Sequence, residues 1–131
     1  MPSSRRPLRE DLAEARAVEC STQISGLQVA GVLDGNEVIG ACRATGGTGH
    51  LVDDDEVYEV QARLARDEGL FCEPAAAVSV AGALAAAREG RIQSEATVAC
   101  LMTSTGFKDT PSVDRLAGAG CPLVDVAEIN W

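Results

Sequence analysis

Aromatic residues are scarce in this chain of 131 residues: two phenylalanines, one tyrosine and one tryptophan make up 3% of it. A hydrophobic core therefore has to come from alanine, valine, leucine and isoleucine, within an apolar fraction of 46%. The length allows one domain with a real core, and it is too short for two.

Long hydrophobic runs and clustered positive charge are also missing. No run reaches the roughly 18 apolar residues of a membrane span, and the basic residues 1–11 lead into no apolar segment of a secretory signal. The formal net charge of −9 argues against nucleic acid and anionic membranes as partners, because phosphate binding needs clustered Lys and Arg. We therefore predict a cytoplasmic protein with neither nucleic acid nor membrane as a partner.

Cysteine and histidine form no recognisable site. The five cysteines are odd in number, far apart and without a CxxC pair, which excludes a disulfide framework and a zinc site. Cys72 and Cys100 fall in apolar segments and are predicted to be core residues. The single histidine, His50, has no nucleophile paired with it by spacing, so we expect a partly buried structural histidine. The acidic run 53–56 lacks the spacing of a calcium loop. No metal site is predicted.

The clearest structural unit of the sequence runs from Glu68 to Gly90. It predicts a short buried strand, a Glu-Pro turn, and a helix that starts at Pro74 and ends before Gly90. The alanine- and valine-rich helix has almost no polar face, which indicates that it belongs inside a larger α/β body.

Predicted strands and helices also alternate along the rest of the chain. The pattern predicts an α/β fold: a three-layer arrangement with a mostly parallel sheet and flanking helices. Residues 1–12 are predicted to be a flexible tail and residues 13–131 a single unit. The predicted strands are Thr48–Val52, Leu70–Cys72 and Ala96–Met102, and the predicted helices are Asp11–Glu19, Asp34 to Gly46, one capped by Asp53, and Ser112–Leu116; an apolar segment, Cys121–Ala127, comes last.

Two polar turns follow predicted strands, after Cys72 and after Met102. Ligands of a parallel sheet bind beyond the carboxyl ends of its strands, so we expect these turns side by side. Glu73 and the hydroxyls of Thr103–Thr105 are then able to orient a small polar ligand. The alternative, which these residues alone favour, is that Glu73 only caps its helix and the hydroxyls only satisfy turn amides.

Two further features resemble parts of a cofactor site: a glycine-rich segment and the single lysine. Gly46–Gly49 follows a predicted helix and precedes a strand, the reverse of a phosphate-binding loop, and is predicted to be a helix end. Lys108 is the only lysine and so the only amine that could form a Schiff base with a carbonyl cofactor. Beside Asp109, an exposed and ion-paired lysine is the commoner outcome.

Three segments, GGTGHLVDDDEV, LARDEGLFCEPAAAVSVAGAL and VACLMTSTGFKD, resemble the threonine synthase family. More broadly, they are similar to fold-type-II pyridoxal-phosphate enzymes, the tryptophan-synthase-β-like superfamily. The similarity covers roughly residues 21–116 and the last part of the family's large domain. It implies pyridoxal phosphate as the cofactor and half of a large domain as the fold.

The resemblance implies roles for particular residues. Thr103 matches the hydroxyl that bonds the pyridine nitrogen, and Glu73 would line the pocket near the ring edge. With Ser104 these form the predicted cofactor-binding set. Ser104 and Thr105 replace the family's usual Gly and His or Asn, which leaves the substrate open.

The family's Schiff-base lysine and phosphate loop lie upstream of the matching region and have no counterpart here, and Lys108 matches a different lysine. The resemblance thus implies the C-terminal portion of a threonine synthase-like lyase, which performs β- or γ-elimination or replacement, with no catalytic residue of its own and inactive alone. The implied partner is the missing N-terminal half or another subunit, and open edges favour self-association. The alternatives are a non-catalytic remnant that binds a partner or small ligand, and an independent α/β binding domain.

Overall fold

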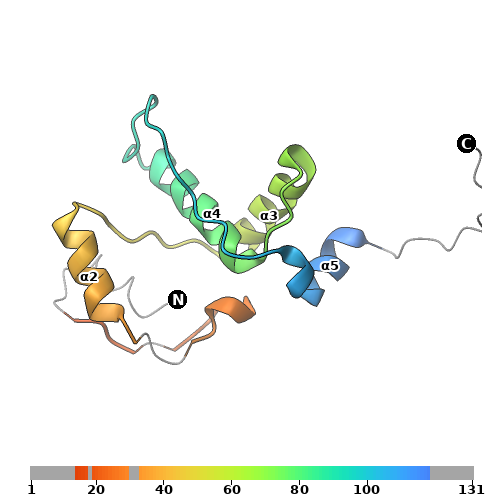
Figure 1. The fold of residues 1–131 in the computed structure, drawn as a ribbon, viewed down its shortest axis with the longest axis horizontal. Coiled ribbons are helices and arrows are strands. Elements are labelled where there is room, and N and C mark those ends of the chain that lie inside the picture. The colour runs from red at the N-terminus through yellow and green to blue at the C-terminus, as the bar shows by residue number, and fades with distance from the viewer. Residues whose placement is uncertain (1–13, 18, 30–32, 119–131) are drawn as a thin grey trace, which may run out of the picture.

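The computed structural model describes residues 14–17, 19–29 and 33–118, which form mainly helices joined by long loops (Figure 1). The predicted tail at 1–12 and the apolar segment Cys121–Ala127 lie outside the described residues. In chain order the elements are the 3₁₀ turn η1 (Ser25–Leu27), α2 (Gly35–Ala44), α3 (Asp54–Glu68), α4 (Pro74–Arg88), the 3₁₀ turn η2 (Gly106–Lys108) and α5 (Thr110–Ala117).

The helices begin and end where local sequence signals predict. Pro74 occupies the first turn of α4, and Gly90 follows its end with a φ of 70°, a left-handed conformation that glycine adopts without strain. The predicted helices after Asp34 and Asp53, and the one around Ser112, are also confirmed. The helix predicted at Asp11–Glu19 is wrong within the described residues, because residues 14–17 and 19 are not helical.

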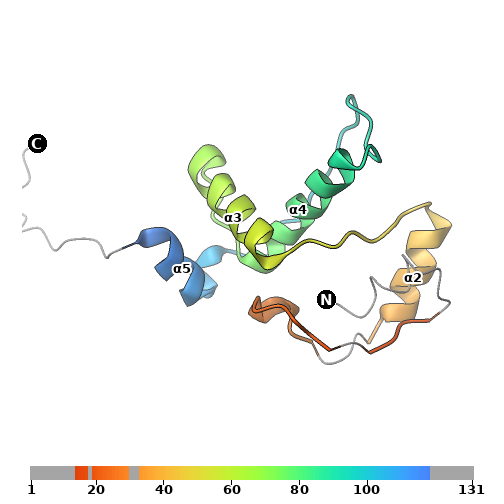
Figure 2. The ribbon, with the colours of Figure 1, turned by 180° about the vertical axis from the view of Figure 1, so that it is seen from behind.

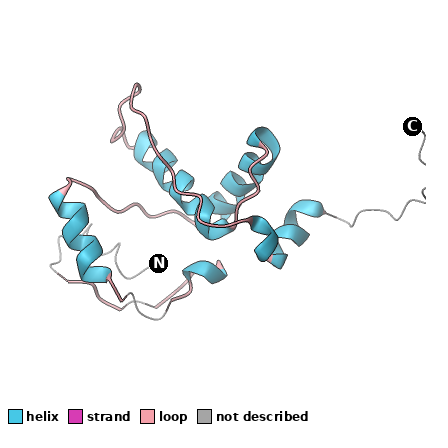
Figure 3. Ribbon diagram, viewed as in Figure 1, coloured by secondary structure: helices cyan, strands magenta, loops and turns pink. Residues whose placement is uncertain are grey.

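The predicted strands are not found. In the part of the chain that the structure describes there is no strand, and the only β pairing is an isolated antiparallel bridge between Cys72 and Thr105 (Figure 3). The prediction of a three-layer, mostly parallel sheet is therefore wrong for these residues. A strand depends on a hydrogen-bonded neighbour, and Ala96–Met102 has none: it runs as a loop beside α4, where Ser79 Oγ donates to the Leu101 carbonyl at 3.1 Å.

α3 and α4 form the centre of the molecule and meet as a V in both views (Figures 1 and 2). Their inner faces bury Val57, Val60, Ala76, Ala77 and Ala81 in one hydrophobic core. The alanines allow the close approach, and an Arg88–Glu56 ion pair also joins the two helices.

The N-terminal segment packs against the start of α4 through η1. A Cβ on Gly26 would lie only 2.8 Å from the Ala75 Cβ, so a glycine is required at this contact. The Asp54 carboxylate accepts hydrogen bonds from Thr22 Oγ1 and from the Gln23 amide, each at 2.6 Å. The acidic first turn of α3 thus anchors this segment as well as favouring the helix dipole.

Much apolar surface stays exposed around this centre. Leu33 is 99% exposed, Leu101 78% and Phe107 77%. Among the described residues, no helix is long and apolar enough to cross a membrane.

Candidate functional site

The turns after Cys72 and after Met102 lie side by side, as predicted. The Glu73 amide donates to the Ser104 carbonyl at 3.1 Å, and the Gly106 amide donates to the Phe71 carbonyl at 3.0 Å. These bonds flank the Cys72–Thr105 bridge. The turns therefore meet through an antiparallel bridge and not, as expected, at the carboxyl ends of parallel strands. Their polar side chains, which we call the rim, are Glu73, Thr103, Ser104, Thr105 and Lys108.

An apolar contact locks the two turns together. The Phe71 ring occupies the space that a side chain on Gly106 would need, with ring atoms well inside normal contact distance of an added Cβ. Phe71 also meets Phe107 edge to face, with 4.9 Å between ring centroids.

The rim side chains fall into two groups. Thr105 Oγ1 accepts from the Phe107 amide at 3.5 Å, which is the turn-satisfying role that the alternative interpretation predicted. In contrast, Thr103 is exposed, Ser104 is half-buried, and neither hydroxyl makes a hydrogen bond to another described residue. These two hydroxyls are available to a ligand.

Glu73 does not cap α4 with its side chain. Its Oε2 atom lies 4.0 Å from Lys108 Nζ, and the Lys108 side chain is 66% exposed. The prediction that Lys108 is an exposed, ion-paired lysine is confirmed, and the interpretation of Glu73 as only a cap is wrong.

A buried polar cluster beneath the rim escaped prediction. Gln61 of α3 is fully buried, and its Nε2 donates to the Cys72 carbonyl at 2.7 Å. Its Oε1 lies 3.3 Å from Ser112 Oγ, and Ser112 is bonded in turn to Asp109. The sequence held one signal: Gln61 lies next to Val60 and one turn from Val57, on the apolar stripe of the helix.

The glycine turn, Gly46–Gly49, and His50 have structural roles. Gly47 donates its amide to the Cys42 carbonyl at 2.6 Å, so it closes the end of α2, as predicted, and does not offer this N–H to a phosphate. His50 is 17% exposed, with Nδ1 3.7 Å from Glu89 Oε2. Both border an open hollow of about 740 Å³ next to α4.

Burial sets the behaviour of Cys72. It is 4% exposed and belongs to the core cluster, as predicted. This burial, followed by the nearby Glu73 charge, raises the pKa of the Cys72 thiol above its usual 9.0, although a backbone hydrogen bond acts the other way. Cys100 is only half-buried, so its predicted place in the core is wrong. The described residues contain no cluster of side chains suited to a metal ion.

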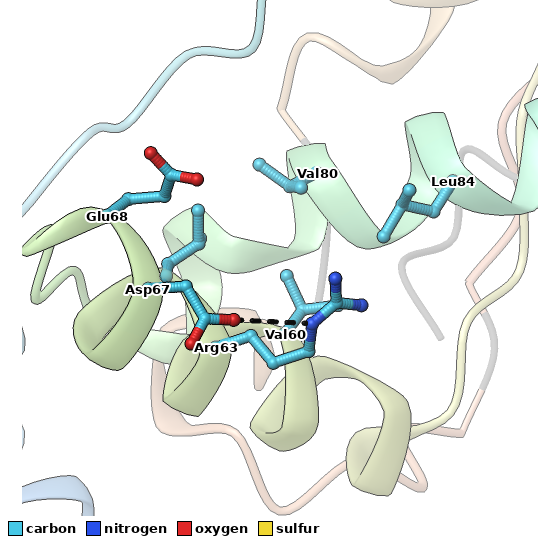
Figure 4. Close-up of a pocket in the computed structure, with 7 residues that line it drawn as sticks. Val60, Arg63, Asp67, Glu68, Val80 and Leu84 are labelled. Atoms are coloured by element: carbon cyan, nitrogen blue, oxygen red, sulfur yellow. Dashed lines mark ion pairs between the residues drawn. The ribbon is translucent and has the colours of Figure 1, made fainter.

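A second cavity, of about 150 Å³, lies between α3 and α4 (Figure 4). Val60, Leu64, Val80 and Leu84 give it apolar walls, and Arg63 and Asp67 pair across one side at 3.9 Å. Its only ionic groups are Arg63, Asp67 and Glu68, none of them a rim residue. It therefore forms no part of the candidate site.

Comparison with known proteins agrees with the sequence resemblance. The family model for pyridoxal-phosphate dependent enzymes matches residues 2–104, which include Glu73, Thr103 and Ser104. Threonine synthase from Methanocaldococcus jannaschii is 33% identical over 94 residues, 72% of this chain and 23% of that protein. Threonine synthase from Synechocystis is 45% identical over 69 residues, 53% of this chain and 18% of that protein. The chain thus spans less than a quarter of the length of these relatives.

Proposed function

Because this chain belongs to the pyridoxal-phosphate dependent enzyme family, we propose that it forms one wall of the cofactor pocket of a threonine synthase-like lyase. The reaction is β- or γ-elimination or replacement on an amino-acid substrate, in the cytoplasm. The observation that carries this proposal is the bridged pair of turns, which brings the Glu73 carboxylate and the two available hydroxyls, those of Thr103 and Ser104, onto one rim.

The rim residues fit one part of the cofactor. Thr103 and Ser104 offer hydroxyls, and Glu73 a carboxylate, to the polar edge of a pyridine ring. A phosphate group needs free backbone amides or cations. On the described rim the one cation, Lys108, faces Glu73, and away from the rim the Gly47 amide closes α2. In this proposal the rim contacts the ring of the cofactor.

Bound pyridoxal phosphate supplies an electron sink for carbanion chemistry at an amino-acid substrate. The Thr103 hydroxyl would donate a hydrogen bond to the pyridine nitrogen without transferring its proton. The nitrogen would stay unprotonated, which moderates the electron-withdrawing power of the ring. Glu73 and Ser104 would close the pocket beside the ring. Lys108 balances the Glu73 charge from the solvent side.

The Schiff-base amine comes from elsewhere in this proposal. Lys108 is an exposed ammonium beside a carboxylate, whereas a catalytic lysine is usually desolvated or placed next to another cation. We therefore assign the Schiff-base lysine and the phosphate loop to a polypeptide other than these 131 residues: the N-terminal half of the family domain or another subunit. The exposed side chains of Leu33, Leu101 and Phe107 leave apolar surface that contact with that polypeptide would cover.

The test is complementation. The chain is mixed with a threonine synthase from which the matching segment has been deleted, and pyridoxal phosphate binding is titrated by absorbance. Thr103→Val should weaken binding by about five- to tenfold, the effect of one lost hydrogen bond. Thr97→Val is the matched control, because Thr97 is an exposed threonine on the same loop.

Equal affinities of the Thr103→Val and wild-type complexes for pyridoxal phosphate would show that Thr103 does not contact the cofactor. A mixture that associates without binding the cofactor would favour the alternative function, a non-catalytic module that binds a partner. Sedimentation of the chain alone separates association with a partner from self-association.

A further inference from the structure

One fully buried side-chain amide, that of Gln61, joins the residue before Glu73 to the start of α5. Gln61 has no exposed surface, and it directly follows Val60, a residue of the hydrophobic core. Its Nε2 donates to the Cys72 carbonyl at 2.7 Å, in the residue directly before Glu73. A buried polar side chain is costly unless it is bonded, so this contact fixes the turn firmly.

The other end of the same amide reaches the start of α5. Gln61 Oε1 lies 3.3 Å from Ser112 Oγ, and Ser112 is also fully buried. The Ser112 hydroxyl is bonded to Asp109 as well, so its one proton is shared between two acceptors. Asp109 directly follows Lys108, and its carboxylate accepts from the Ser112 amide at 3.1 Å.

One side chain of α3 therefore joins the Cys72–Glu73 turn to the start of α5. We propose that Gln61 is a positioning residue, which holds the Cys72–Glu73 turn and the start of α5 at a fixed separation and so sets the geometry of the rim. The inference rests on the proposed function for what the rim binds. The hydrogen bonds that carry it do not depend on any cofactor.

The readout is amide hydrogen exchange of the full chain, measured by NMR. The Glu73 and Gly106 amides report directly, because their bonds join the two turns. Gln61→Met keeps the length of the side chain and removes both hydrogen bonds. It should lower protection at these two amides by about tenfold or more, with little change at amides in the middle of α4.

The matched control is Gln28→Met. Gln28 Nε2 also donates to a backbone carbonyl, that of Thr22 at 2.9 Å, but it is exposed and far along the chain from the rim. Exchange at Glu73 and Gly106 should stay as in the wild type.

Gln61→Glu separates positioning from simple packing. Only the protonated form of the introduced carboxyl can donate to the Cys72 carbonyl, so protection should be near normal at low pH and fall as pH rises. The charged or titratable groups around it are Asp109 before α5, Arg115 of α5, Glu73 and the Cys72 thiol. The wild type keeps a neutral amide and should show no such step.

Unchanged exchange in Gln61→Met, or the absence of the pH step in Gln61→Glu, would overturn the inference. If Gln61→Met fails to fold, amide protection in Gln61→Glu at low and at high pH still tests whether Gln61 positions the turn. If the exchange results hold but the complemented protein binds no cofactor, the proposed function fails and the positioning role stands.

Discussion

At Gly106 the absence of a side chain allows the two turns to meet. Gly106→Ala should destabilise the chain by about 1–3 kcal/mol, because the new methyl group has to displace the Phe71 ring. The measurement is urea unfolding followed by circular dichroism.

The matched control is Gly82→Ala in α4, where an added Cβ meets nothing within 4 Å. This change should stabilise the helix by about 0.5–1 kcal/mol. Equal effects of the two substitutions would contradict the close contact at Gly106.

Cys72 gives a pH-dependent prediction at the same scale. Its raised pKa keeps the thiol protonated at pH 8, so alkylation should be slower than at the half-buried Cys20, Cys42 and Cys100. The rate should increase as pH rises through the raised pKa. Burial of the neutral thiol stabilises the fold fully at pH values below the thiol pKa of the unfolded chain. This stabilisation is lost as pH rises through the higher thiol pKa of the folded chain.

Peptide mass spectrometry after timed iodoacetamide treatment measures these rates. Denaturant should abolish the difference. Labelling of Cys72 in the native chain as fast as Cys42 would show that it is not buried.

At the scale of elements, α5 depends on its cap. Asp109 accepts from the Ser112 amide at 3.1 Å, so Asp109→Ala should cost about 1 kcal/mol, and Asp109→Asn should cost less because asparagine caps equally well. The change is measured as the free energy of unfolding in urea.

Asp34 is the control at this scale. It precedes α2 but makes no side-chain cap bond, so Asp34→Ala should cost clearly less than Asp109→Ala. The opposite order would contradict the capping geometry.

The elements that could be predicted from sequence are those whose signals are local. Pro74 and Gly90 mark the two ends of α4 within the chain itself, and the structure confirms them. Strands need a partner, and Ala96–Met102 meets α4 instead of another strand in the described region. The apolar run was recognisable from sequence, but its pairing was not.

The candidate site shows the same division. The sequence predicts Glu73 and Ser104 as neighbours, but from the meeting of parallel strand ends, whereas an antiparallel bridge brings them together in the structure. The Gln61 cluster could not be predicted, because its bonds join residues 11 and 51 positions apart, and only the folded chain brings these together.

At the scale of the whole molecule, α3, α4 and η1 form a small core with an open surface around it. The chain covers 23% of the Methanocaldococcus threonine synthase and leaves large apolar side chains such as Leu101 and Phe107 in solvent. Under the proposed function, these residues provide the ring-facing wall of the pocket, and residues beyond these 131 provide the amine.

In the proposed function the Schiff-base amine comes from outside these 131 residues, and reductive trapping of the bound cofactor identifies the lysine that supplies it. The chain is incubated with one equivalent of pyridoxal phosphate, reduced with borohydride and analysed by mass spectrometry, alone and with the complementing polypeptide. We predict no stoichiometric adduct on Lys108 in the chain alone, and an adduct on a lysine of the complementing polypeptide in the mixture. A stoichiometric Lys108 adduct in the isolated chain, lost in Lys108→Ala, would contradict the assignment of the amine to another part of the enzyme.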